Sequence, residues 1–268
     1  MNQTEKKLAE LVRRIKHRGH LKSIKAEFEA EGTRSDELLR LLDVTRNSNV
    51  PLTLKIGGCE AVKDLYEARQ FGAKYIVAPM IESAYALTKF VDTIDKVYPP
   101  EEAQDMKFLF NMETEQSYVN RDQIMAVAAS SPSIAGVVFG RTDYSGSIGM
   151  KGDVQHENVT ASIEAVAQML MDSRLDLVVG GAISIASLPE LNRIAKYKLT
   201  RFETRKVVFD AASLADESLQ ESLLDAVHFE ILWLINKSEY YGCLHREDKA
   251  RIAQLEQRWN VLQREITI

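Results

Sequence analysis

The chain has 268 residues, of which 45% are hydrophobic and 27% charged, a balance typical of a globular protein with a large core. Its formal net charge of −5 argues against a nucleic-acid-binding surface, and the longest strongly apolar stretch near the C-terminus, residues 228–235, is too short to span a bilayer. Cys59 and Cys243 are its two cysteines. We therefore expect no disulfide framework, no zinc site, no membrane contact and a cytoplasmic location.

The first element along the chain is an amphipathic helix within residues 1–20, which places Leu8, Leu11, Val12 and Ile15 on one face. Beyond this helix, strand-like and helix-like segments alternate. Strands are predicted at residues 23–29, 51–57, 75–81, 107–113, 134–140, 175–181 and 201–209. Helical patterns lie between them at residues 35–47, 59–72, 83–98 and 159–173.

This alternation of strands and helices is typical of a parallel sheet covered by helices. The number of units favours a closed (β/α)8 TIM-type barrel with parallel strands over an open sheet. The count of confident strands is seven, so one strand is hidden or missing. We predict a single domain over residues 1–268, with the N-terminal helix at 1–20, the barrel at 21–212 and a helical C-terminal extension at 213–268.

The C-terminal extension has more apolar surface than the outer ring of one barrel needs. Its first amphipathic stretch contains the run "LLDAVHFEILWLI", and a second, "REDKARIAQLEQRWNVLQREI", follows it. We therefore expect a homo-oligomer whose contacts involve this extension.

Several predicted strands carry charges, although the strands of a parallel barrel are normally apolar on both faces. Alternation places Lys25 with Glu27, Glu29 and Glu31, Lys55 with Thr53, Asn111 with Glu113, and Glu203 with Arg205. Buried charges must be paired, bound to a metal or close to solvent. Because barrel enzymes build their active sites at the C-terminal mouth, we expect these side chains to gather there. The alternative is that each is a solvated loop residue.

Two of these strand ends carry carboxylates on neighbouring strands. Glu113 follows the fourth predicted strand and Asp143 follows the fifth, and adjacent strands lie only about 4.8 Å apart. Two carboxylates at that spacing can hold one hard cation, and an all-oxygen site suits Mg²⁺ or Mn²⁺. The small-residue loop "GRTDYSGSIG" that contains Asp143 could offer backbone amides to a carboxylate or a phosphate.

Three segments in this order, "VAPMIES", "FNMETEQ" and "VVFGRTDYSGSIG", resemble the HpcH/HpaI aldolase and citrate lyase beta-subunit family of the phosphoenolpyruvate/pyruvate barrel superfamily. The resemblance covers roughly residues 23–212. It implies a (β/α)8 barrel, a divalent metal held by a Glu and an Asp, and carbon–carbon bond chemistry through a pyruvate-like or acetyl-like enolate. By this resemblance Glu113 and Asp143 are the metal ligands.

The same resemblance places the substrate carboxylate at the amides near Thr142 and Asp143, so we assign substrate binding to the segment Gly140, Arg141, Thr142 and Asp143. For Arg141 two roles stay open, pairing with Asp143 or with an acid of the substrate. The chain departs from the family pattern in two places. Lys55 stands where the family usually has an arginine that polarises the keto group, and lysine lacks the bidentate fork. The segment at 23–31 offers only glutamates where the aldolases often carry an acid–histidine pair.

These residues predict a Mg²⁺- or Mn²⁺-dependent carbon–carbon lyase or aldolase that acts on a small oxo acid. Lys55 would stabilise the enolate, and Glu27 or Glu29 would move the proton. An enzyme that uses phosphoenolpyruvate on the same barrel is one alternative. A barrel that has lost catalysis and serves as a binding or interaction protein is another.

Overall fold

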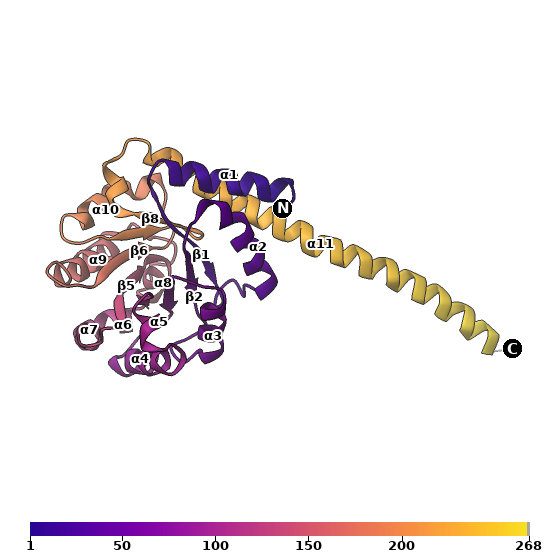
Figure 1. Ribbon diagram of the computed structural model, residues 1–268, viewed down its shortest axis with the longest axis horizontal. Coiled ribbons are helices and arrows are strands. Elements are labelled where there is room, and N and C mark those ends of the chain that lie inside the picture. The colour runs from indigo at the N-terminus through magenta and orange to yellow at the C-terminus, as the bar shows by residue number, and fades with distance from the viewer. Residues whose placement is uncertain (267–268) are drawn as a thin grey trace.

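The computed structural model describes residues 1–266, and these form a closed eight-stranded barrel ringed by helices (Figure 1). The strands are neighbours in chain order all the way round. They are β1 (Leu21–Glu27), β2 (Leu52–Lys55), β3 (Tyr75–Ala78), β4 (Lys107–Met112), β5 (Ile134–Gly140), β6 (Asp176–Gly180), β7 (Arg201–Glu203) and β8 (Val207–Asp210). The TIM-type barrel that the sequence predicts is confirmed.

The eighth strand was hidden in the segment predicted as one strand at 201–209. That segment folds into a hairpin, with β7 and β8 antiparallel and Phe202 opposite Phe209. β8 also runs antiparallel to β1, so the prediction of an all-parallel barrel is wrong at this one strand. Because β8 runs back toward the N-terminal end of the barrel, the chain leaves the barrel there. β1 also begins two residues earlier than predicted, at Leu21.

The helices pack their apolar faces on the outside of the barrel. They are α1 (Gln3–His17), α2 (Ser35–Thr45), α3 (Val62–Gln70), α4 (Ala84–Val97), α5 (Pro100–Ala103), α6 (Glu115–Val119), α7 (Arg121–Ser130), α8 (Arg141–Ser147), α9 (Glu157–Met169), α10 (Leu188–Ala195) and α11 (Leu219–Ile266), with short 3₁₀ turns at Arg46–Ser48, Ile185–Ser187 and Ala211–Ala215. Residues such as Leu8, Leu38, Phe90 and Phe229 are fully buried in the main core between the helices and the strands.

The inside of the barrel is divided into an apolar and a charged half. A small apolar cluster of Val77, Leu109, Val138 and Val178 fills the side formed by β3 to β6. On the side formed by β1, β2 and β7, the inward positions include the buried charges of Lys25, Lys55 and Glu203. This division directs the ionic groups toward one side of the barrel mouth.

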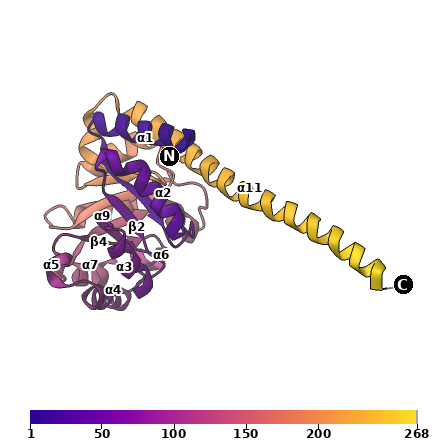
Figure 2. The same ribbon diagram turned by 45° about the vertical axis from the view of Figure 1, so that its right-hand side comes forward.

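The C-terminal extension is one continuous helix of 48 residues, α11, which first packs beside α1 and then projects away from the barrel (Figures 1 and 2). The two helices are antiparallel, because Arg18 at the end of α1 pairs with Asp225 while Asn2 at its start bonds Asn236 at 2.7 Å. No helix among residues 1–266 is long and apolar enough to cross a membrane.

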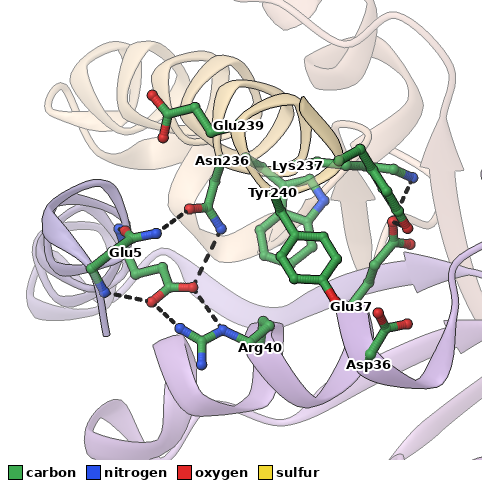
Figure 3. Close-up of a pocket in the computed structure, with 11 residues that line it drawn as sticks. Glu5, Asp36, Glu37, Arg40, Asn236, Lys237, Glu239 and Tyr240 are labelled. Carbon is green, nitrogen blue, oxygen red and sulfur yellow. Dashed lines mark hydrogen bonds and ion pairs between the residues drawn. The ribbon is translucent and has the colours of Figure 1, made fainter. Parts of the chain in front are cut away.

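The last anchors of α11 lie in a pocket of about 360 Å³ between α1, α2 and α11 (Figure 3). Glu5 of α1 is buried there, accepting hydrogen bonds from Arg40 and from Asn236. Glu37 of α2 accepts a hydrogen bond from the Tyr241 hydroxyl at 2.6 Å and pairs with Lys237 at 3.0 Å. These contacts fix the direction in which α11 leaves the barrel.

Candidate active site

A pocket of about 530 Å³ lies at the C-terminal mouth of the barrel and gathers nearly all the side chains that the sequence assigned to the site. Its lining includes both predicted metal ligands, Glu113 and Asp143. The other predicted site residues that line it are Glu27, Glu29, Lys55, Gly140 and Thr142. They come from the ends of β1, β2, β4 and β5, which explains why residues distant in sequence meet here.

Glu113 is the most enclosed carboxylate of the pocket. It follows β4, and its side chain is only 2% exposed. Oε1 accepts a hydrogen bond from the backbone N–H of Met80 at 3.1 Å, and Oε2 accepts one from Asn111 Nδ2. Burial raises the pKa of Glu113, although nearby Lys55 opposes the shift, while Asp143 adds to it.

The turn after β3 is shaped to make this contact with Glu113. Met80 adopts a left-handed conformation with φ of 50°, which is uncommon for a residue other than glycine. Its backbone N–H points at Glu113 Oε1. The strained turn therefore holds the carboxylate in place, as backbone strain does at many functional sites.

Asp143 lies in the first turn of the short helix α8 rather than in the small-residue loop that the sequence predicted. Its side chain is exposed and faces the pocket lining. Gly140 precedes the helix and offers no side-chain cap to its first amides. A Cβ at position 181 would lie 2.6 Å from the backbone nitrogen of Thr142, so Gly181, with φ of +90°, is the residue that this close approach allows.

Arg141 does not join the pocket, and the prediction that it binds substrate or pairs with Asp143 is corrected here. Its side chain is fully buried and forms an ion pair with Glu190 of α10. The guanidinium also donates to the carbonyl oxygen of Gly181 at 2.6 Å and to the Ser187 hydroxyl at 3.3 Å. Because α8 is helical from Arg141 onward, residues 141 and 143 point in different directions. Arg141 instead ties α8 to the structure beneath it.

Lys55 ends β2 and brings a positive charge to the centre of the pocket. Its Nζ lies 3.0 Å from Glu29 Oε2 and 3.5 Å from Glu113 Oε2. Burial alone would lower the pKa of Lys55, but the carboxylates of Glu113 and Glu29 outweigh it and raise the pKa above its usual value. The side chain is therefore an ammonium ion at neutral pH, which suits oxyanion stabilisation and opposes a role as an amine nucleophile.

The two candidate proton carriers differ in their environment. Glu27 is held by Lys25, whose Nζ lies 3.0 Å from Glu27 Oε1 and 2.5 Å from Glu203 Oε1. Burial would raise the pKa of Glu27, but the charge of Lys25 outweighs it and holds the pKa below its ordinary value. Glu29 lies beyond the end of β1, and the charge partner of its Oε2 is Lys55.

The pocket also holds residues that sequence reasoning did not assign. Lys25, Asn111, Glu203 and Arg205 line it, and their alternation on predicted strands was the signal that could have identified them. Glu230 of α11 also lines it and accepts a hydrogen bond from the Lys206 N–H at 3.0 Å. A single acid on a helical tail carries no such signal.

The donor set of the pocket fits a hard divalent cation. Among its carboxylates are those of Glu113 and Asp143, whose oxygens are donors of the kind such a cation binds, and the buried Asn111 Oδ1 has no hydrogen-bond partner. Of the described residues that line the pocket, six are acidic and three are basic, so a bound cation would relieve an excess of negative charge. Within residues 1–266 no group of three or more His, Cys, Asp or Glu side chains forms a metal cage. A site with two carboxylates suits Mg²⁺ or Mn²⁺, which keep water and substrate oxygens as their other ligands.

The fold is a closed α/β barrel, and its carboxylates gather at the C-terminal mouth, where enzymes with this fold have their active sites. The chain belongs to the HpcH/HpaI aldolase/citrate lyase family, whose model matches residues 37–182. This is a family of lyase- and aldolase-type enzymes that act on small-molecule acids, and its aldolases generally depend on a divalent metal. No curated protein matches the chain in a sequence comparison.

Solved structures share this fold at low sequence identity. An HpcH/HpaI aldolase from Desulfitobacterium hafniense DCB-2 superposes with a TM-score of 0.58 and 17% identity over 80% of this chain and 86% of its own. An HpcH/HpaI aldolase/citrate lyase family protein from Burkholderia cenocepacia J2315 gives a TM-score of 0.58 and 15% identity, covering 81% and 90%. The citrate synthase SbnG gives 0.56 and 12%, covering 82% and 89%.

Proposed function

We propose that the protein is a Mg²⁺- or Mn²⁺-dependent carbon–carbon lyase or aldolase that acts on a small oxo acid through an enolate. The observation that carries the proposal is the meeting of Glu113, Asp143 and the Lys55 ammonium in one pocket at the barrel mouth. Family membership supports the reaction class. The exposed apolar face of α11 supports a further proposal, that the enzyme is a homo-oligomer.

Glu113 and Asp143 are the residues that would hold the cation. When bound, the cation supplies Lewis acidity to the carboxylate and keto oxygens of the substrate. The enclosure of Glu113 by Met80, Asn111 and Lys55 fixes its carboxylate before anything binds, so little reorganisation is needed.

Lys55 and Glu29 divide the remaining chemistry in this proposal. In the cleavage direction, the proton of the substrate hydroxyl passes to Glu29, the carbon–carbon bond breaks, and a carbonyl product leaves. The bonding electron pair becomes the enolate, whose negative oxygen lies against the Lys55 ammonium. Glu29 then returns this proton, directly or through water, to the enolate carbon, which gives the oxo-acid product and restores the carboxylate. Both glutamates pair with a lysine, but the Glu29 side chain is 26% exposed and that of Glu27 10%, so Glu29 is the more accessible to a substrate.

The uncapped first turn of α8 next to Gly140 and Thr142 would take the substrate carboxylate, since amides at a helix start attract anions. Gly181 leaves room for that approach, because any side chain there would collide with Thr142. Arg141 contributes by holding α8 in place from below.

The proposal is tested by a screen of hydroxy-oxo acids with added Mg²⁺ or Mn²⁺. The readout is release of pyruvate or oxaloacetate. We expect turnover with at least one substrate, its loss on chelation, and its loss in Glu113→Gln. Turnover that survives both chelation and Glu113→Gln would contradict the proposal.

A further inference from the structure

The projecting helix α11 carries two rows of exposed apolar side chains that share one face of the helix, called here the α11 seam. The seam consists of Leu224, Val227, Ile231, Leu234, Ile252, Leu255 and Trp259. Each of these side chains is at least 44% exposed. Successive members are separated by three or four residues within each half. The seven-residue repeat continues unbroken from Leu234 to Ile252. All members of the seam therefore occupy the a and d positions of one heptad repeat, as in a coiled coil.

The seam lies on the side of α11 that its own barrel does not use. Ala226, Phe229 and Trp233, which interleave with the first half of the seam, are the side chains that are buried against the barrel. Beyond the anchor at Tyr241, residues 243–260 are all exposed. With 48 residues, α11 is about 72 Å long, so its second half extends far from the barrel surface.

We infer that α11 pairs with α11 of a second copy of this chain as an antiparallel coiled coil, with the two-fold axis close to Cys243. In this register Leu234 meets Ile252 of the second copy, Ile231 meets Leu255, and Val227 meets Trp259. Every such layer joins an a position to a d position, which is the layer pattern of antiparallel coiled coils. The two apolar halves of the seam cover each other.

The middle of the seam decides between the two possible directions. The positions there in the same phase are Ser238, Tyr241, His245 and Asp248. A parallel, in-register pair would place Asp248 against Asp248, and enclosing two like charges is unfavourable. The antiparallel register places Ser238 opposite Asp248, a pair that can form a hydrogen bond, and it places His245 opposite Tyr241, whose hydroxyl donates to Glu37 of its own chain.

The positions that flank the seam agree with this register. Glu230 comes beside Arg258 of the second copy, and His228 comes beside Glu256. At the axis Gly242 meets its own copy, which permits close approach. One like-charged pair, Lys237 and Arg251, is formed, but each already has an acidic partner on its own chain, Glu37 and Glu247. Flanking charges set partner choice and direction in coiled coils.

The register connects the second copy to the barrel mouth. Glu230 lines the mouth pocket, so Arg258 of the second copy would lie at its rim. Each copy would thus add a basic residue beside an acid-rich pocket of the other. The inference depends on α11 alone, and it stands whether or not the proposed lyase activity is found.

Engineered disulfides test the register directly. In a Cys59→Ser, Cys243→Ser background, Val227→Cys with Trp259→Cys should give a covalent dimer on oxidation, whereas either substitution alone should not. Ile231→Cys alone serves as the parallel control, because that residue would meet its own copy only in a parallel pair. Cross-linking by Ile231→Cys alone, with none by the pair, would overturn the antiparallel register.

Light scattering tests the association itself. We expect a mass of at least about twice the 30.2 kDa of one chain at micromolar concentration. Ile252→Glu with Leu255→Glu places charges in the seam but touches no barrel contact, and it should return the protein to one chain. A parent protein that runs as a 30.2 kDa particle would overturn the inference, and so would a double variant that associates as tightly as the parent.

Discussion

Gly140 passes so close to Glu113 that a Cβ on residue 140 would lie 2.8 Å from both Cβ and Oε2 of Glu113. The last residue of β5 is therefore a glycine because the carboxylate of the neighbouring strand occupies the space where a side chain would be. This contact sets the position of Glu113 relative to Asp143, since Gly140 leads directly into the helix that carries Asp143.

Gly140→Ala should displace Glu113, because the carboxylate is enclosed and the new methyl group has no other room. We expect turnover to fall by about 100-fold, the cost of moving a catalytic group by roughly 1 Å. Gly146→Ala is the matched control. Gly146 lies in α8, the helix that follows Gly140, and it has open space around it, so this variant should leave turnover unchanged. Equal turnover of the two variants would contradict the role given to the 140–113 contact.

Lys55→Ala should lower turnover by at least about 100-fold, the scale seen on removing one oxyanion donor. The fold should persist, because the side chain lies in the pocket and leaves no core cavity. Lys63→Ala, at an exposed position on α3, is the control and should be silent. Steady-state kinetics that show parental turnover for Lys55→Ala would remove Lys55 from the mechanism.

The raised pKa of Glu113 predicts a particular pH dependence of stability. An acid with a higher pKa in the folded than in the unfolded protein holds its proton more tightly when folded. The folded state therefore loses stability as the pH rises from the ordinary value of 4.5 through the raised pKa. Glu113→Gln cannot ionise, so in metal-free buffer its Tm minus that of the parent should increase over this range. A difference that stays constant with pH would show that burial does not shift the pKa.

Arg141→Met should destabilise the protein rather than impair substrate binding. It leaves Glu190 buried without its partner, which costs about 3–5 kcal/mol, or on the order of 10 °C in Tm for a domain of this size. Adding Glu190→Leu removes the unpaired charge and should recover most of the loss. If calorimetry shows Arg141→Met as stable as the parent while KM rises sharply, the guanidinium reaches the substrate after all.

The residues at the strand ends were predictable from sequence, because a charged side chain that follows an apolar strand of a barrel is expected at the mouth, where it can reach solvent, a partner or a metal. Glu113, Lys55 and Asp143 were placed at the mouth by this argument, and the structure brings all three into one pocket. The direction of Arg141 was not predictable, because seven residues rich in Gly and Ser do not show the helical period that turns its side chain inward.

The β7–β8 hairpin was missed for a related reason. Its turn at residues 204–206 contains neither glycine nor proline, so the segment appeared as one continuous strand. The backbone contact that Met80 makes with Glu113 could not be predicted either, since the left-handed conformation of Met80 has no sequence signature. Such details depend on tertiary contacts that local patterns do not record.

The central claim is that Asp143 and Glu113 bind one divalent cation, and Mn²⁺ titration of Asp143→Asn tests it most directly. Mn²⁺ at about 100 times its Kd should stabilise the parent by about 2.7 kcal/mol and raise its Tm. Asp143→Asn should keep the Tm of the metal-free protein but lose both the calorimetric binding of Mn²⁺ and this shift. Asp153→Asn, an exposed acid outside the pocket lining, should retain both. If Asp143→Asn binds Mn²⁺ as tightly as the parent, Asp143 is not a ligand and the proposed catalytic site is wrong.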